Sequence, residues 1–265
     1  MLRSLNKITG YTIIDAAHEP VGQANDFYFD NKTWTVRYLV VDTGVWLPGR
    51  KVLIAPTALG QPDWGGGVSF PINLTKEEIE NSPPVDTDKP VSRQVEMDVV
   101  SYHDWPAYWE DVSFMEAGMV GMNPAGYLSR MNQASSEEQA QVAELEELAR
   151  TETVTEPYLR SVNEVIGYYI QARDGDIGHV EDFIVETETW AVQYMIIDTG
   201  NWLPGKKVLI APHWVQAIDW NETKVFIDLT QHTIEKSPEY DPSEPVNRDY
   251  ENRLFDYYGR PKYWT

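Results

Sequence analysis

The chain has 265 residues, and its 21 lysines and arginines face 42 aspartates and glutamates, which gives a formal net charge of −21. A chain this acidic repels phosphate backbones, which argues against direct nucleic-acid binding. It contains no cysteine, which excludes disulfides, thiolate metal sites and cysteine nucleophiles. No stretch has the apolar character of a signal peptide or a transmembrane helix, so we expect a cytoplasmic protein.

Short β-strands separated by turn residues dominate the first hundred residues. In "TWTVRYLVVD", Trp34, Val36, Tyr38 and Val40 alternate and share one face of a strand. The next apolar run, "KVLIAP", stops at Pro56. Further candidate strands are 8–14, 21–30, 58–64 and 67–72. About six short strands in so small a segment predict a closed barrel, which leaves no sheet edge exposed.

Helical signals follow these strands. Thr75 and Glu78 match a capping box, which predicts one short helix. A proline-punctuated stretch then ends in "PAYW", and we expect it to fold back as an extended arm over a barrel face. Ser135 with Glu138 forms another capping box, at the start of "ASSEEQAQVAELEELAR". We interpret that segment as a surface linker helix, with a partner-binding helix as the alternative.

The second half of the chain repeats the first. "RYLVVDTGVWLPGRKVLIAP" begins at Arg37 and "QYMIIDTGNWLPGKKVLIAP" begins at Gln193, and fourteen of these twenty positions are identical. An offset of 156 residues is too long for a solenoid period, so we infer a duplicated module. The predicted domains are a module over 1–110, an acidic linker over 111–160 and a module over 161–265. We expect the two modules to pack as a pseudo-twofold pair, with the second short helix near Thr230.

Each repeat carries the triplet Asp-Thr-Gly after two apolar residues, as the active sites of aspartic proteases do. Paired carboxylates can share a proton and activate water, so Asp42 and Asp198 define a hydrolase alternative. The repeats nevertheless match well past the triplet, and the apolar-apolar-glycine element that follows it in such proteases is not duplicated. Because aspartate often begins a turn and glycine supplies positive φ, we interpret Asp42, Gly44, Asp198 and Gly200 as turn-forming residues.

Other signs of catalysis are weak in this sequence. None of the five histidines has a histidine at the equivalent repeat position, although a duplicated site would require one in each copy. There is no Gly-rich phosphate loop, no nucleophile elbow and no loop with the spacing of a calcium site. We therefore predict no catalytic residues, no cofactor and no metal.

Aromatic residues beside basic ones are the best candidates for an interaction surface. Trp46 and Trp202 lie in the two "WLPG" turns, close to Arg50 and Lys206. Each repeat also ends in an aromatic tail, whose candidate residues are Trp105, Trp109, Tyr258 and Trp264. Buried, such tails would stabilise a small module by about a few kcal/mol per aromatic ring. Exposed, they and the turn tryptophans are typical anchors of a protein interface.

These residues resemble the PRC-barrel domain. The match rests on Gly22, Asp26, Trp34, "VVDTG" and "KVLIAP", and again on Gly178, Asp182, Trp190, "IIDTG" and "KVLIAP". That domain occurs in the reaction-centre H subunit of photosynthesis, in the ribosome-maturation factor RimM and in small tandem proteins. The resemblance implies a mainly β fold of two six-stranded barrel-like modules. It also implies a protein-docking role without catalytic residues.

We therefore expect a non-enzymatic scaffold or adaptor for protein partners, with a stress-related role as one form of it. The sequence leaves homo-oligomerisation open. The alternatives are the hydrolase, a RimM-like ribosome-associated factor and, by analogy of fold alone, an electron-transfer component like the H subunit.

Overall fold

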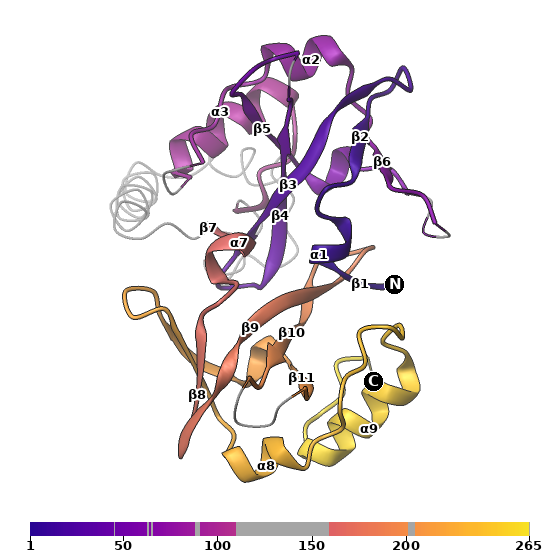
Figure 1. Cartoon of the computed structure of the whole chain (residues 1–265). Coiled ribbons are helices and arrows are strands. Elements are labelled where there is room, and N and C mark those ends of the chain that lie inside the picture. Colours follow the sequence, from indigo (N-terminus) through magenta and orange to yellow (C-terminus); the bar gives the residue numbers. More distant parts are fainter. Residues whose placement is uncertain are drawn as a thin grey trace, which may run out of the picture. The chain divides into compact units, whose positions relative to one another are not determined.

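The computed structural model (Figure 1) describes residues 1–44, 46–62, 64, 66–87, 91–109, 159–200 and 205–264. The chain forms two compact units. The first combines Met1–Glu80 with Tyr158–Thr265, and the second is Asn81–Pro157. The first unit therefore contains the strands of both sequence repeats. The linker helix predicted from Ser135 and Glu138 lies outside the described residues, and the domain boundaries at 110 and 160 stay predictions.

The first repeat supplies five strands to a six-stranded sheet with the order β5-β4-β3-β2-β6. These strands are β2 (Thr12–Ile14), β3 (Pro20–Asp30), β4 (Thr35–Asp42), β5 (Lys51–Ile54) and β6 (Ser69–Pro71). Neighbours are antiparallel except for β2 and β6, which are parallel. The predicted strands at 21–30 and 67–72 are confirmed, and the strand that follows Trp34 begins at Thr35.

The second repeat forms the larger sheet, of seven strands, in the order β11-β10-β9-β8-β13-β12. The second repeat supplies six of these strands: β8 (Tyr169–Ala172), β9 (Gly175–Glu186), β10 (Val192–Asp198), β11 (Lys207–Ile210), β12 (Val215–Asp219) and β13 (Lys224–Ile227). The mainly β fold class is thus confirmed. The described pairings follow an open path in each sheet, so closure into a barrel stays a prediction.

Each repeat sends its first strand into the sheet of the other repeat (Figure 1). Strand β1 (Leu2–Ser4) pairs with β9, and β7 (Leu159–Ser161) pairs with β3, both antiparallel. A one-turn helix follows each exchanged strand: α1 (Leu5–Ile8) in the first repeat and α7 (Val162–Val165) in the second. The exchange is reciprocal, which confirms the pseudo-twofold arrangement and interlocks the repeats.

The pseudo-twofold relation is clearest where equivalent residues meet. Thr35 and Ala191, which are 156 positions apart, form an isolated bridge with each other. On either side, Val36 N donates to Trp190 O at 2.9 Å, and Val192 N donates to Trp34 O at 2.7 Å. Each tryptophan has a left-handed backbone, with φ of +51° and +59°, so each lies in the turn before its strand. The prediction that Trp34 shares a face of the strand with Val36 is therefore wrong, because β4 begins at Thr35.

The core is continuous between the repeats. Val36, Tyr38, Leu39, Val40 and Val41 of β4 are each at most 2 % exposed, so both faces of that strand are buried. Across the junction, Phe29 contacts Phe183 with ring centroids 5.6 Å apart, and Phe27 stacks on Trp190 at 6.1 Å. Large rings from both halves thus share one apolar interior, which favours a single cooperative unit.

Two strand predictions are corrected by the structure. The segment 8–14 contains the end of α1 and only the short strand β2. The described residues of the segment 58–64 form no regular strand. The segment begins at the end of the 3₁₀ turn η1 (Pro56–Ala58), and of these described residues Leu59 alone forms a bridge, to Ile72. The second repeat has a turn η2 (Pro212–Trp214) at the same place, followed by a true strand, β12.

The two short helices predicted to follow the strands are confirmed, whereas the helices of the tails were not predicted. Helix α2 (Lys76–Asn81) begins with the predicted capping box, in which Thr75 N donates to Glu78 Oε2 at 2.7 Å. Helix α8 (Gln231–Glu235) begins after Thr230, as expected. The tails are not extended arms, because α3 (Arg93–His103) and α9 (Arg248–Tyr258) each span eleven residues. The side chains of Ser92 and Asn247 cap these helices, and neither helix contains proline.

Candidate functional site

The twin aspartates of the Asp-Thr-Gly triplets hold turns. Asp42 Oδ1 accepts the main-chain N–H of Gly44 at 2.9 Å, and Asp198 Oδ1 accepts that of Gly200 at 2.8 Å. Both glycines have positive φ, +64° and +56°, which suits glycine best. Asp42 ends β4 in one sheet and Asp198 ends β10 in the other. This geometry is that of two separate Asx turns.

A second glycine in each repeat makes room for the same turn. A Cβ added to Gly22 would lie 2.3 Å from the carbonyl oxygen of Asp42. The equivalent atom on Gly178 would lie 1.9 Å from the carbonyl oxygen of Asp198. Real Cβ atoms do not approach backbone this closely, so both glycines are required by the close crossing of two strands. Gly22 and Gly178 therefore belong to the same structural feature as the Asp-Thr-Gly turns that they contact.

Another pair of aspartates joins the two repeats. Asp182 accepts bonds from Ser4 Oγ at 2.5 Å and Asn6 N at 3.1 Å, both from the first repeat. Asp26 accepts the equivalent hydrogen bonds from Ser161 Oγ at 2.5 Å and Asn163 N at 3.2 Å, both from the second repeat. We call these two groups the aspartate clasps: Asp182 with Ser4 and Asn6, and Asp26 with Ser161 and Asn163.

The clasp carboxylates are buried, at 8 % exposure for Asp26 and 4 % for Asp182. Desolvation by burial raises the pKa of both carboxyl groups, although the hydrogen bonds from serine and the main chain partly offset it. Each carboxylate also accepts the N–H of its following residue, Phe27 or Phe183. Three donors on each aspartate indicate a structural role. The sequence contained the signal, a Ser-x-Asn pair in each repeat, but only the structure shows where it binds.

The turn residues predicted as interaction anchors make internal contacts. The Trp46 indole N–H donates to Val21 O at 2.8 Å, and Lys76 Nζ lies 4.5 Å from the centroid of its ring. Lys206 Nζ donates to the carbonyls of Ile234, Glu235 and Ser237 at 2.6–3.3 Å, at the end of α8. Desolvation lowers the pKa of this lysine. The main-chain N–H of Arg50 donates to Leu47 O at 3.1 Å. Trp202 lies outside the described residues.

In the second tail, a buried glutamate collects the aromatic candidates. Glu251 is 2 % exposed, and its Oε1 accepts hydrogen bonds from Tyr194 at 2.8 Å and from Tyr263 at 2.7 Å. Arg248 forms an ion pair with Glu251 at 3.0 Å and lies over the Trp264 ring at 4.1 Å. Burial raises the pKa of both tyrosines, and the hydrogen bond to Glu251 and the charge of that carboxylate raise it further. The cluster fastens α9 to β10.

Tyr258 continues this packing, since its ring lies 4.7 Å from that of Trp214. Phe255 of the same helix also contacts Trp214 at 5.6 Å. These contacts place α9 over the turn η2.

The first tail repeats the same chemistry within its own unit. Tyr108 donates to Glu96 at 2.7 Å, and Arg93 pairs with Glu96 at 3.1 Å while lying 4.2 Å from the Trp109 ring. Trp105 stacks on His103 at 4.2 Å. Trp109 and Trp264 thus each lie over an arginine that pairs with the buried glutamate of their own tail.

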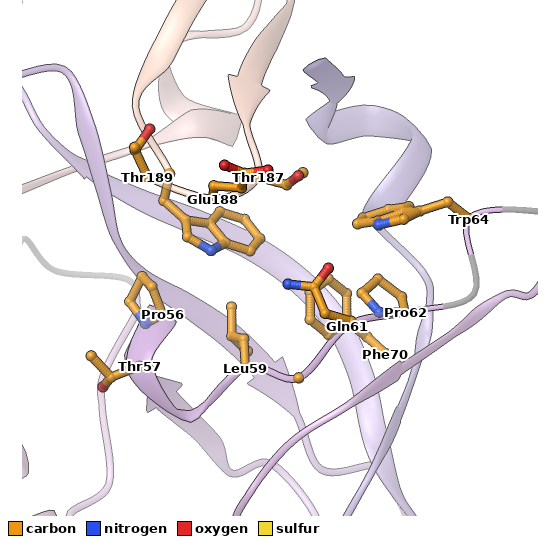
Figure 2. A pocket seen from close by; sticks show the side chains of 12 residues that line it. Pro56, Thr57, Leu59, Gln61, Pro62, Trp64, Phe70, Thr187, Glu188 and Thr189 are labelled. Carbon is orange, nitrogen blue, oxygen red and sulfur yellow. The ribbon is translucent and has the colours of Figure 1, made fainter. Parts of the chain in front are cut away.

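A pocket opens where the two repeats meet (Figure 2). Its volume is about 350 Å³, and it is lined from both repeats. In Figure 2, Thr187 and Glu188 of the turn after β9 face Leu59, Gln61 and Pro62 of the first repeat. The remaining lining residues are Pro56, Thr57, Gly60, Trp64, Phe70, Thr189 and Trp190. None of these residues was predicted as a site, because the pocket forms only when distant parts of the sequence come together.

The pocket has an aromatic wall. Phe70 lies 6.1 Å from both Trp64 and Trp190, measured between ring centroids. Trp190 is 6 % exposed, whereas Thr57, Glu188 and Thr189 are exposed. Rigid rings along a wall and polar groups at the rim are typical of sites that bind a ligand group.

Within the described residues, no group of three or more His, Asp or Glu side chains could hold a metal ion. Among those residues there is also no helix with the length and apolar character needed to cross a membrane.

The comparison with protein families gives a match in each repeat. The PRC-barrel domain model matches residues 2–60 and 159–232, one range in each repeat. The matched ranges contain both aspartate clasps and both Asp-Thr-Gly turns, and they end before the aromatic tails. The comparison with curated proteins gives no match. The two matched ranges cover half of the chain, and this protein belongs to the PRC-barrel domain family as a tandem member.

Proposed function

We propose that this tandem PRC-barrel protein is a non-enzymatic adaptor that binds a protein partner at the pocket between its repeats. The observation that carries the proposal is the composition of that pocket. Trp64, Phe70 and Trp190 form one wall, and side chains of both repeats complete it. Aromatic rings at the centre and polar groups at the rim are the usual composition of a protein-binding hot spot.

The contacts of the paired aspartates support an adaptor more than a hydrolase. Asp42 and Asp198 are in different sheets, and each carboxylate binds the N–H of its own turn glycine. A shared proton, which the hydrolase mechanism needs, requires two carboxylates held close together.

The internal contacts of Trp46 favour the pocket over this turn tryptophan as the binding surface. Trp46 uses its indole N–H on Val21, and its ring is covered by Lys76. The tail aromatics Trp109 and Trp264 each stack with an arginine of their own tail. Within this proposal, the turns and tails support the fold and the pocket meets the partner.

Site-specific crosslinking in living cells tests the proposal. A photoreactive phenylalanine derivative replaces Thr57, which is exposed at the pocket rim, or Glu244, which is exposed and outside the pocket lining. We expect a discrete adduct with one protein from the Thr57 position and not from the Glu244 position. Identical adducts from both positions, or none from either, would contradict the proposal.

A further inference from the structure

The charge of the pocket is one-sided. Among the described residues that line it, Glu188 is the only one with a formal charge. In the first repeat the equivalent turn position is Lys32, since "ETETW" aligns with "DNKTW". The two turns are therefore alike in length and opposite in charge at this position. A carboxylate here makes the pocket attractive to a cation.

The aromatic wall favours the same kind of ligand. The faces of tryptophan and phenylalanine rings carry negative electrostatic potential and attract cations. Trp64 already shows this behaviour, because the guanidinium of Arg3 lies 4.7 Å from its ring centroid. The formal net charge of −21 adds a long-range attraction for basic partners. Ring faces, the rim carboxylate and the overall charge all favour a cation, whereas the Arg3 guanidinium beside Trp64 opposes one.

From these observations, and resting on the proposed function, we propose that the pocket binds a lysine side chain from a basic segment of the partner protein. The apolar stem of the lysine would lie along Leu59, Pro62 and the aromatic wall. Its ammonium group would lie against the rings, within reach of Glu188. A volume of about 350 Å³ is at the small end of the range for ligand sites, which suits one long side chain.

A pair of small probes tests the proposal on the full chain. Nα-acetyl-lysine amide carries the cation, and Nα-acetyl-norleucine amide has a similar apolar stem without it. Binding is followed by the shifts of the tryptophan indole N–H signals in NMR spectra, with Trp64→Phe used to assign its signal. We expect the lysine probe to bind about fivefold more tightly than the norleucine probe and to shift the Trp64 and Trp190 signals. Equal affinity for the two probes would overturn the proposal.

Charge variants at the rim give a sharper test. Glu188→Lys introduces the residue type that the first repeat has at this turn, so we expect the fold to tolerate it. We expect this variant to lose binding of the lysine probe and to keep its weak binding of norleucine. The control Glu244→Lys makes the same change in net charge at an exposed position outside the pocket and should leave lysine binding within about twofold of wild type. Lysine binding that is unchanged in Glu188→Lys, or lost equally in both variants, would refute the assignment.

A third variant distinguishes a cation from an anion as the ligand. Arg3→Met removes the guanidinium beside Trp64, and we expect it to tighten lysine binding about twofold. Weaker lysine binding in Arg3→Met would contradict the proposal. These outcomes are independent of the adaptor role, because a pocket that fails to prefer lysine can still yield the crosslinked partner at Thr57. A missing crosslink with intact lysine preference would refute the adaptor alone.

Discussion

At the scale of single residues, the aspartate clasps stabilise the fold by hydrogen bonds to carboxyl groups that are buried in the interior. Asp26 and Asp182 are buried, and each accepts bonds from a serine and an asparagine of the opposite repeat. Replacing either aspartate by alanine would leave several buried donors without an acceptor, at a cost of about 1–3 kcal/mol per unsatisfied group. The burial that makes each clasp specific also raises the pKa of its carboxyl group.

The raised pKa values predict how stability depends on pH. Between the unfolded value of 3.8 and the higher folded value, the folded chain binds protons at Asp26 and Asp182 that the unfolded chain releases. Unfolding releases protons in this window, so the contribution of the clasps is fully present below the unfolded pKa and is lost as pH rises through the folded pKa. In Asp26→Asn/Asp182→Asn the amides can still accept the main-chain bonds but do not titrate.

We therefore expect the free energy of unfolding of the wild type, relative to this double variant, to decrease as pH rises above about 4 and through the raised pKa of the folded state. Urea unfolding at each pH measures it. The exposed substitution Asp249→Asn is the control and should follow the wild type. A difference that grows with pH would contradict the assignment.

At the scale of elements, the sequence was informative where local pattern decides the structure. Alternation along "TWTVRYLVVD" and the capping residues Thr75 and Thr230 predicted strands and short helices that the structure contains. The tail helices were missed because the prolines that flank them resemble those of an extended arm, although Tyr250, Leu254 and Tyr258 recur at helical spacing. The pocket was beyond prediction, since Glu188 and Leu59 meet only through tertiary packing.

The buried glutamate of α9 yields a prediction for that element. Glu251→Ala would leave the hydroxyls of Tyr194 and Tyr263 without their acceptor and Arg248 without its ion-pair partner. Because Arg248 is half exposed, we expect a loss of about 2–3 kcal/mol, which is less than for a fully buried pair. Glu251→Gln keeps one acceptor and should lose less.

Urea unfolding measures the loss, and limited proteolysis reports whether the C-terminal tail detaches first. The exposed substitution Glu244→Ala is the reference and should change stability by less than about 0.5 kcal/mol. Equal losses for Glu251→Ala and Glu251→Gln would argue against hydrogen bonding as the cause.

At the scale of the whole molecule, the exchange of β1 and β7 makes the repeats parts of one structure. Duplication was evident from the sequence and predicted a pseudo-twofold pair, which the mirrored strand pairings confirm. The exchange itself could not be predicted. A similar one-turn helix follows β1 and β7, so each of these strands would fit either sheet. Geometry of the connection, not local preference, selects between the two sheets.

The interlock predicts that the halves stay together without a continuous chain. A protease site inserted between residues 110 and 158 allows the folded full chain to be cut. We expect both fragments to elute together in size-exclusion chromatography, because β1 and β7 each remain paired with the opposite repeat. Ser4→Ala/Ser161→Ala, which removes the clasp hydroxyls, should promote dissociation at lower urea concentrations than in the cut wild type. Fragments that separate under native conditions would contradict the interlock.

The meeting of Thr35 with its own equivalent, Ala191, has an evolutionary consequence. In a homodimer, one codon change alters both sides of such an axis simultaneously, so any specialised feature must appear twice. Fusing two copies in one gene removes that restriction, and each side can then diverge alone. A lysine at one turn and a glutamate at the other, Lys32 and Glu188, is a divergence that a homodimer of a single repeat could not show.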